Sequence, residues 1–177
     1  IAMITELWAW NKVRLNEGKL PVDIGVGLNT DNVVSGTIGS KKRMDYTIIG
    51  DGVNLAARLE SACKQYGAHI LISEFTYKQL RGTYYSRELD LVVVKGKTQP
   101  VSIYEILDYH TEESYPQMSD ALRLFKAGLK KYRQQKWAEA KSEFQDVLAL
   151  NDHDKAAKLY IERCGHFIGS PPGNDWD

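Results

Sequence analysis

The chain has 177 residues, and its 23 lysines and arginines balance its 23 aspartates and glutamates, so the formal net charge is zero at pH 7. That balance gives no global field toward nucleic acid or an anionic membrane, and neither is expected as a partner of this segment. Apolar residues make up 43% and no run approaches the roughly 20 apolar residues of a membrane span, so the composition predicts one globular domain, or one domain with an appendage.

Two further features indicate the cellular compartment of the chain and whether it is part of a longer protein. Its two cysteines, Cys63 and Cys164, lie far apart in sequence, which favours reduced thiols in the cytoplasm over a disulfide framework. The sequence starts at Ile1 without methionine, inside an amphipathic pattern, and no signal peptide is visible. We therefore expect a piece of a longer protein, whose upstream domains could anchor it to a membrane.

The first forty residues predict a helix and then two strands. Apolar residues recur at helical spacing over residues 1–16. Alternation over residues 22–28 predicts a strand, and its glycines indicate the close approach of another backbone or of a ligand. After an Asx-type turn at residues 29–32, residues 33–38 predict a second strand that forms a hairpin with the first. Residues 39–43 form a basic loop.

The next stretch, RMDYTIIGDGVNLAARLES over residues 43–61, predicts a strand, a tight turn and a helix. The strand covers residues 46–49, and the helix begins near Val53 with Asp51 as its cap. Asn54 and Arg58 are four residues apart, so they share a helix face away from the apolar stripe of Leu55, Leu59 and Ala62. An amide and a guanidinium beside a glycine turn suit a ligand that carries phosphate.

The rest of the chain predicts a sheet and then a helical segment. The helix ends near Gly67, residues 68–73 form a strand, and a brief helix follows from Ser73 to about residue 80. Residues 84–95 and 101–107 form a hairpin. A linker over residues 108–119 leads to helices over 120–134, 137–150 and 154–164, the last capped by Asp154, before an irregular tail at 166–177.

Two segments carry a family resemblance: GTIGSKKRMDYTIIGDGVNLAARLES and, further along, VKGKTQPVSIYEI. They resemble the class III nucleotidyl cyclase catalytic domain, and bacterial adenylate cyclases of the cyanobacterial type in particular. The resemblance covers residues 1–107, which would be the C-terminal part of that domain, incomplete at its N-terminus. It implies an α+β fold of ferredoxin-like type that pairs head to tail, with each active site built from both subunits of a homodimer.

The resemblance also implies roles for individual residues. Asn54 matches the asparagine that orients the ribose, and Arg58 the arginine that stabilises charge on the phosphates in the transition state. Thr47 falls where the family selects the base, and Lys95 matches the lysine that holds the terminal phosphates. Either lysine at positions 41–42 could contact phosphate from the other subunit. The implied reaction turns ATP into 3′,5′-cyclic AMP and pyrophosphate with Mg²⁺ or Mn²⁺, for intracellular signalling.

These roles agree with the chemistry. The ribose 3′-hydroxyl attacks the α-phosphorus in line and pyrophosphate leaves, so fixed cations and two metal ions are the natural catalytic tools. The threonine hydroxyl at position 47 can accept a hydrogen bond from the adenine amino group but can also donate one, so its base selectivity is softer than that of aspartate.

The chain departs from the family pattern upstream. The two metal-binding aspartates, and the lysine that partners the base-selecting residue, belong to segments that precede this sequence. Asp23, Asp31 and Asp51 do not sit in the matching motifs and are not replacements. We therefore expect no metal site in this chain and no cyclase activity from it alone. The alternatives are an inactive cyclase-like nucleotide-binding or regulatory module, or a guanylate cyclase. A diguanylate cyclase is disfavoured because an acidic Gly-Gly signature is missing.

The helical segment at residues 120–165 resembles one tetratricopeptide repeat. Gly128, Ala140 and Phe144 fit the repeat, and Tyr132 is one place off the pattern. Such repeats normally need about three copies to be stable. A single unit must therefore pack on the cyclase domain or on a protein partner.

Overall fold

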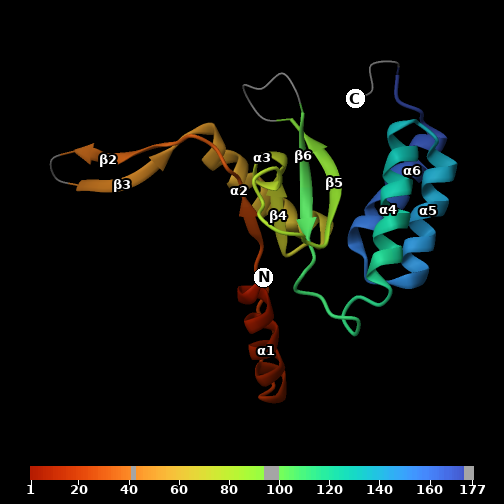
Figure 1. The fold of residues 1–177 in the computed structure, drawn as a ribbon, viewed down its shortest axis with the longest axis horizontal. Coiled ribbons are helices and arrows are strands. Elements are labelled where there is room, and N and C mark those ends of the chain that lie inside the picture. The colour runs from red at the N-terminus through yellow and green to blue at the C-terminus, as the bar shows by residue number, and fades with distance from the viewer. Residues whose placement is uncertain (41–42, 94–99, 174–177) are drawn as a thin grey trace.

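A computed structural model describes residues 1–40, 43–93 and 100–173 and shows a mixed α+β fold (Figure 1). The helices and strands, in chain order, are α1 Ala2–Asn16, β1 Val26–Leu28, β2 Val34–Ser40, β3 Arg43–Ile49, α2 Asp51–Tyr66, β4 Ile70–Ser73, α3 Glu74–Tyr77, β5 Ser86–Val92, β6 Val101–Ile106, α4 Met118–Arg133, α5 Trp137–Leu150 and α6 Lys155–Gly169.

Four strands form the main sheet in the order β1-β4-β6-β5, with β1 parallel to β4 and the other neighbours antiparallel. The predicted hairpin of β5 and β6 is confirmed. Strands β2 and β3 pair only with each other in the described chain and form a separate antiparallel ribbon, which we call the arm. Figure 1 shows the arm extending to one side of the sheet, with helices α4–α6 on the other side.

The predicted pairing of the first two strands is wrong, because β1 pairs with β4 and β2 pairs with β3. The turn at residues 29–32 does not fold back along β1. Instead the Asn29 side chain donates to the Gly52 carbonyl at 3.1 Å and accepts from the Ser73 hydroxyl at 2.6 Å. These bonds fix the turn between the start of α2 and the end of β4, so the chain leaves the sheet and enters the arm.

Helix α2 lies close against β1, as the glycines of that strand predicted. A Cβ atom on Gly27 would collide with the Ala56 carbonyl and the Glu60 amide. Leu55 and Leu59 are buried beneath the helix. The backbone itself therefore approaches the strand, which only glycine allows here.

The two ends of α2 differ in how well they were predicted. The helix begins at Asp51 rather than Val53, and its N-cap is Gly50, without a side-chain capping bond. Asp51 is therefore not the cap. It lies in the first turn, where a carboxylate still interacts favourably with the helix dipole. Gly67 follows the helix in the left-handed conformation with φ 69°, as predicted.

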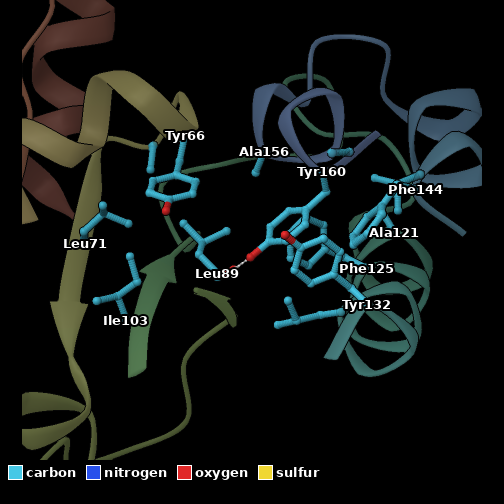
Figure 2. Packing of buried hydrophobic residues seen from close by; sticks show 14 of the residues in the cluster. Tyr66, Leu71, Leu89, Ile103, Ala121, Phe125, Tyr132, Phe144, Ala156 and Tyr160 are labelled. Carbon is cyan, nitrogen blue, oxygen red and sulfur yellow. Dashed lines mark hydrogen bonds between the residues drawn. The ribbon is translucent and has the colours of Figure 1, made fainter. Parts of the chain in front are cut away.

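The hydrophobic core is continuous from the sheet into the C-terminal helices. Figure 2 shows Leu71, Leu89 and Ile103 of the sheet and, across from them, Phe125, Phe144 and Tyr160 of the helices, all fully buried. The Tyr160 hydroxyl donates to the Leu89 carbonyl of β5 at 2.6 Å. The helical segment thus packs on the cyclase-like sheet, one of the two options that its sequence left open.

A buried charge network crosses the same junction. The Arg87 guanidinium of β5 pairs with Glu105 of β6 at 2.7 Å and with Asp154 before α6 at 2.5 Å. The Tyr115 hydroxyl donates to Asp154 at 2.6 Å. Burial alone would raise the pKa of Asp154, but the charge and hydrogen bond of Arg87, together with the bonds from Tyr115 and the Ala157 amide, outweigh it and the pKa is lowered. Burial raises the pKa of Glu105 despite its pairing with Arg87.

Helix α6 runs further than predicted. Asp154 caps it by accepting from the Ala157 amide at 2.9 Å, as expected. The helix continues to Gly169, so residues 166–169 are helical rather than part of an irregular tail. The Phe167 ring packs on Trp137 with a centroid distance of 4.8 Å, which extends the buried face by another turn.

Candidate nucleotide-binding site

Three of the predicted site residues lie along one strand, turn and helix. Thr47 is half-buried on β3, opposite Gly36 of β2, and lies two residues before the strand ends. Asn54 lies in the first turn of α2, and Arg58 follows one turn later. Both are exposed because the opposite face of α2 holds the buried stripe. The hydroxyl therefore lies on a strand, and the amide and guanidinium lie on the helix that follows it, as the sequence predicted.

Arg58 also reaches the end of β5. Its Nη1 donates to the carbonyl of Val93 at 3.4 Å. Val93 is the last described residue before the segment 94–99, which contains Lys95. Lys95 itself lies outside the described residues, and so do Lys41 and Lys42. The structure thus brings Arg58 to the point where the chain enters the segment with the predicted phosphate-binding lysine.

The surroundings of these residues form an open surface. The neighbouring arm exposes large apolar side chains: Val34 is 75% exposed, Tyr46 72% and Met44 62%. The register places Val34, opposite Ile49, on one face of the ribbon, and Met44 and Tyr46 on the other face, so both faces expose apolar side chains. The site side chains are thus displayed beside an uncovered apolar arm.

No metal centre is formed by the described residues, among which no group of three or more His, Cys, Asp or Glu could hold an ion. Asp23 faces His69 at 3.0 Å, and Asp31 accepts from the amide of the next residue at 2.8 Å. Asp51 is exposed in the first turn of α2. The donor set in the described part of the chain therefore does not fit the two divalent ions that the family resemblance implies.

The sequence did not reveal how the start of α2 is fixed. A Cβ atom on Gly52 would lie 2.5 Å from the Asp31 Cβ and 3.0 Å from the Asn29 amide nitrogen. The first turn of α2 therefore sits directly on the loop after β1, held by the Asn29 side chain. The only signal in the sequence was the Asx chemistry of residues 29–32, which predicted a turn but not this contact.

Comparison with known proteins identifies the family. Residues 2–108 match the adenylate and guanylate cyclase catalytic domain. The chain belongs to this cyclase family. Its segments around Thr47, Asn54 and Arg58 all lie inside the matched range, and so do all four strands of the main sheet.

Several relatives of this cyclase chain are curated as adenylate cyclases. One from Dictyostelium discoideum, described as terminal-differentiation specific, is 38% identical over 147 residues, covering 81% of this chain and 7% of the relative. One from Anabaena cylindrica is 43% identical over 88 residues, covering 48% of this chain and 18% of the relative. The chain therefore spans less than a fifth of the length of these relatives.

A solved structure supports the same family assignment. The adenylyl cyclase CyaB from P. aeruginosa matches with a TM-score of 0.53 and 38% identity, over 60% of this chain and 54% of that one. The match to the Dictyostelium relative reaches further than the cyclase range. Residues 2–108 cannot supply an alignment that covers 81% of the chain, so that similarity continues into the helices after the sheet.

Proposed function

We propose that this cyclase chain is the C-terminal part of an adenylate cyclase catalytic domain that converts ATP to 3′,5′-cyclic AMP and pyrophosphate. The observation that carries the proposal is the arrangement of Thr47, Asn54 and Arg58 along one strand, turn and helix, inside a family in which the Dictyostelium and Anabaena relatives are curated as adenylate cyclases. The relevant fold is the ferredoxin-like type, and the expected location is the cytoplasm.

Each residue has a role that suits its chemistry. The Thr47 hydroxyl accepts from the adenine amino group, and the Asn54 amide orients the ribose. The 3′-hydroxyl then loses its proton to solvent, and its oxygen bonds to the α-phosphorus in line while the bond to the pyrophosphate oxygen breaks. Arg58 stabilises the charge that builds on the phosphate oxygens, and Lys95 holds the terminal phosphates. Mg²⁺ or Mn²⁺ is expected as cofactor, with its ligands on the upstream segment that carries the family's aspartates.

A homodimer is the expected working form. Two features of the chain support it: the exposed apolar side chains of the arm, and β1, which has β4 as its single strand partner in the described chain. An uncovered apolar ribbon and an open strand edge both favour association with further protein. In a head-to-tail dimer the open wall around Arg58 would be completed by the second subunit.

Arg58 gives the sharpest test of the proposal. In the complete cyclase, Arg58→Ala should lower kcat by about 10²–10³-fold, the usual effect of removing one donor to a developing oxyanion, with a much smaller change in ATP binding. Arg81→Ala is the matched control, because Arg81 is an exposed arginine after α3. Equal losses in turnover and ATP binding would argue against a transition-state role.

Thr47 tests the choice of nucleotide. Thr47→Ala removes the hydroxyl that faces the base in this proposal, so the ratio of kcat/KM for ATP over GTP should fall. An unchanged ratio would contradict this role. A wild-type ratio that favours GTP would support a guanylate cyclase, which the family description also includes.

The second candidate is a cyclase-like module that binds a nucleotide or a partner without catalysis. The described residues form no metal-ligand cluster, which agrees with this candidate and equally with the first one, whose metal ligands are expected upstream. An assay of the complete protein with Mn²⁺ and ATP separates the two candidates, because cyclic AMP from it would exclude the inactive module. The purified chain alone is expected to form no cyclic AMP under either candidate, and measurable product from it would overturn that expectation.

We also propose that the helical extension is a single unit similar to a tetratricopeptide repeat. A Cβ atom on Gly128 of α4 would lie 2.9 Å from the Phe144 ring of α5. Such close packing at a glycine supports a repeat-like helix pair, and a protein partner is then expected on its remaining surface. No helix in the described part of the chain is long and apolar enough to cross a membrane.

A further inference from the structure

A cavity of about 790 Å³ lies between α4 and the outer strand β5. Leu122, Phe125 and Leu129 of α4 line one side of it. Tyr104 of β6 and Tyr77 of α3 line another side and stack in parallel, with ring centroids 4.1 Å apart. We call this cavity the α4 groove. Phe125 and Leu129 are buried behind the wall, so the accessible apolar contacts come from Leu122 and the two tyrosines, which belong to separate parts of the fold.

The α4 groove is rich in positive charge. Four cations from α4 line it: Arg123, Lys126, Lys130 and Arg133. Glu88 is the one carboxylate among the described residues that line the groove. It already accepts hydrogen bonds from Arg133 at 2.8 Å and from the Ser102 hydroxyl at 2.8 Å.

The lysines of the groove are the cations left for a ligand. Arg123 pairs with Asp120 at 3.3 Å, but both side chains are largely exposed, so this pair is weak. Lys126 and Lys130 make no ion pair within the part of the chain that the structure describes. Arg87 also lines the groove, but Glu105 and Asp154 neutralise it from behind. The accessible charge of the groove is therefore positive.

The length of the row of cations indicates which kind of ligand fits the groove. Arg123 and Arg133 are ten residues apart, so at about 1.5 Å per residue the cation row is about 15 Å long. A single phosphate or carboxylate is much shorter, whereas about four or five residues of extended chain cover that length. The apolar side chains of Leu122, Phe125 and Leu129 run beside the row at helical spacing.

An extended peptide matches both rows at once. Successive side chains of an extended chain point to opposite sides. A segment that alternates acidic with apolar residues would therefore direct carboxylates to the lysines and apolar groups to the groove floor and the tyrosines. We propose that the α4 groove binds an extended acidic segment of a partner protein in which acidic and apolar residues alternate.

The test uses the full chain and a labelled synthetic peptide that alternates glutamate with leucine and phenylalanine, measured by fluorescence anisotropy. We expect binding that weakens as salt is added, because exposed charge pairs are screened. Lys126→Glu together with Lys130→Glu should weaken binding tenfold or more, since two attractions become repulsions. Circular dichroism checks that the variant is folded.

The matched control is Lys136→Glu with Lys158→Glu, which makes the same change of charge on exposed lysines outside the groove. It should bind the peptide nearly as well as the unchanged chain. A second control peptide keeps the glutamates but replaces the apolar residues with serine, and it should bind more weakly.

Four outcomes would overturn the proposal. The first is no binding by the unchanged chain, and the second is an equal loss in both charge variants. The third is displacement by inorganic pyrophosphate together with equal binding of the serine peptide, which would indicate a general anion site. The fourth is displacement of the peptide by ATP but not by pyrophosphate, with this displacement lost in Tyr77→Ala. That result would indicate a nucleotide site in which the base stacks on Tyr77. Hydrogen exchange that slows in α4 only with the acidic-apolar peptide would support the proposal independently.

Discussion

Asp154→Asn tests whether the buried charge network holds the helical extension on the cyclase sheet. The Asp154 carboxylate is 1% exposed and the Arg87 guanidinium 6%, so neither can be rescued by water without opening the junction. Asparagine keeps the shape of the side chain and can still accept from the Ala157 amide. It removes the negative charge that faces Arg87 and weakens the bond from the Tyr115 hydroxyl.

The expected loss follows from what remains. Breaking a buried ion pair by removing one partner costs about 3–5 kcal/mol. Here Glu105 still pairs with Arg87 at 2.7 Å. The substitution also removes the Asp154 charge, which is one cause of the raised pKa of Glu105, whereas burial, the largest cause, is unchanged. The loss should therefore lie near the lower bound, about 3 kcal/mol. Asp154→Ala also removes the helix cap and should cost about 1 kcal/mol more.

Urea unfolding followed by circular dichroism measures these free energies at pH 7. Asp152→Asn is the matched control, because its side chain is 84% exposed, and it should change stability by less than about 0.5 kcal/mol. The pKa of Asp154 is lowered in the fold, so its contribution is present above the unfolded pKa and is lost as the pH falls through the folded pKa. A loss under about 1 kcal/mol in the asparagine variant would refute the role of the pair.

Two further predictions follow from the packing. Gly27→Ala should destabilise the chain by about 1–3 kcal/mol, since its methyl group meets α2 backbone, whereas Gly36→Ala in the arm meets nothing within 4 Å and should have little effect in the same urea titration. Equal effects at both glycines would contradict the close contact of β1 and α2. Burial, with smaller effects from His69 and Arg87, lowers the pKa of His110 to about 4 from 6.5. Its contribution to stability should therefore be present above pH 6.5 and lost toward pH 4, so His110→Phe should flatten the dependence of the urea midpoint on pH, and an unchanged slope would count against it.

Local signals predicted most elements of the fold but not the partners of the strands. The stripe of α2, the glycine that ends it and the cap at Asp154 are short-range features, and each was predicted correctly. Alternation identified β1 and β2 but could not tell which strands they pair with, because register and partner depend on contacts between distant residues. Strand β1 also came out shorter than predicted, since Val22 bonds to the Asn11 side chain at 2.7 and 2.8 Å instead of to a neighbouring strand.

The order of the site residues followed from the sequence, whereas their supports did not. Thr47, Asn54 and Arg58 sit on the strand and helix where the motif placed them. The contacts of Asn29 with Gly52 and of Arg58 with the Val93 carbonyl join segments that no periodicity relates. Hydrogen bonds of this kind depend on the tertiary arrangement, so a single sequence shows the donors without their acceptors.

Helix α2 connects the candidate site to the helical extension. Its first half displays Asn54 and Arg58, and its last residue, Tyr66, donates to the Asp90 carboxylate of β5 at 2.7 Å. Arg163 of α6 donates to the same carboxylate oxygen at 2.6 Å. The end of the site helix, the strand that leads toward Lys95 and the extension thus meet at one carboxylate. The similarity to the Dictyostelium cyclase also continues past the sheet, so the extension shares with the sheet and with the helix that carries Arg58 both a packed core and a region of sequence similarity.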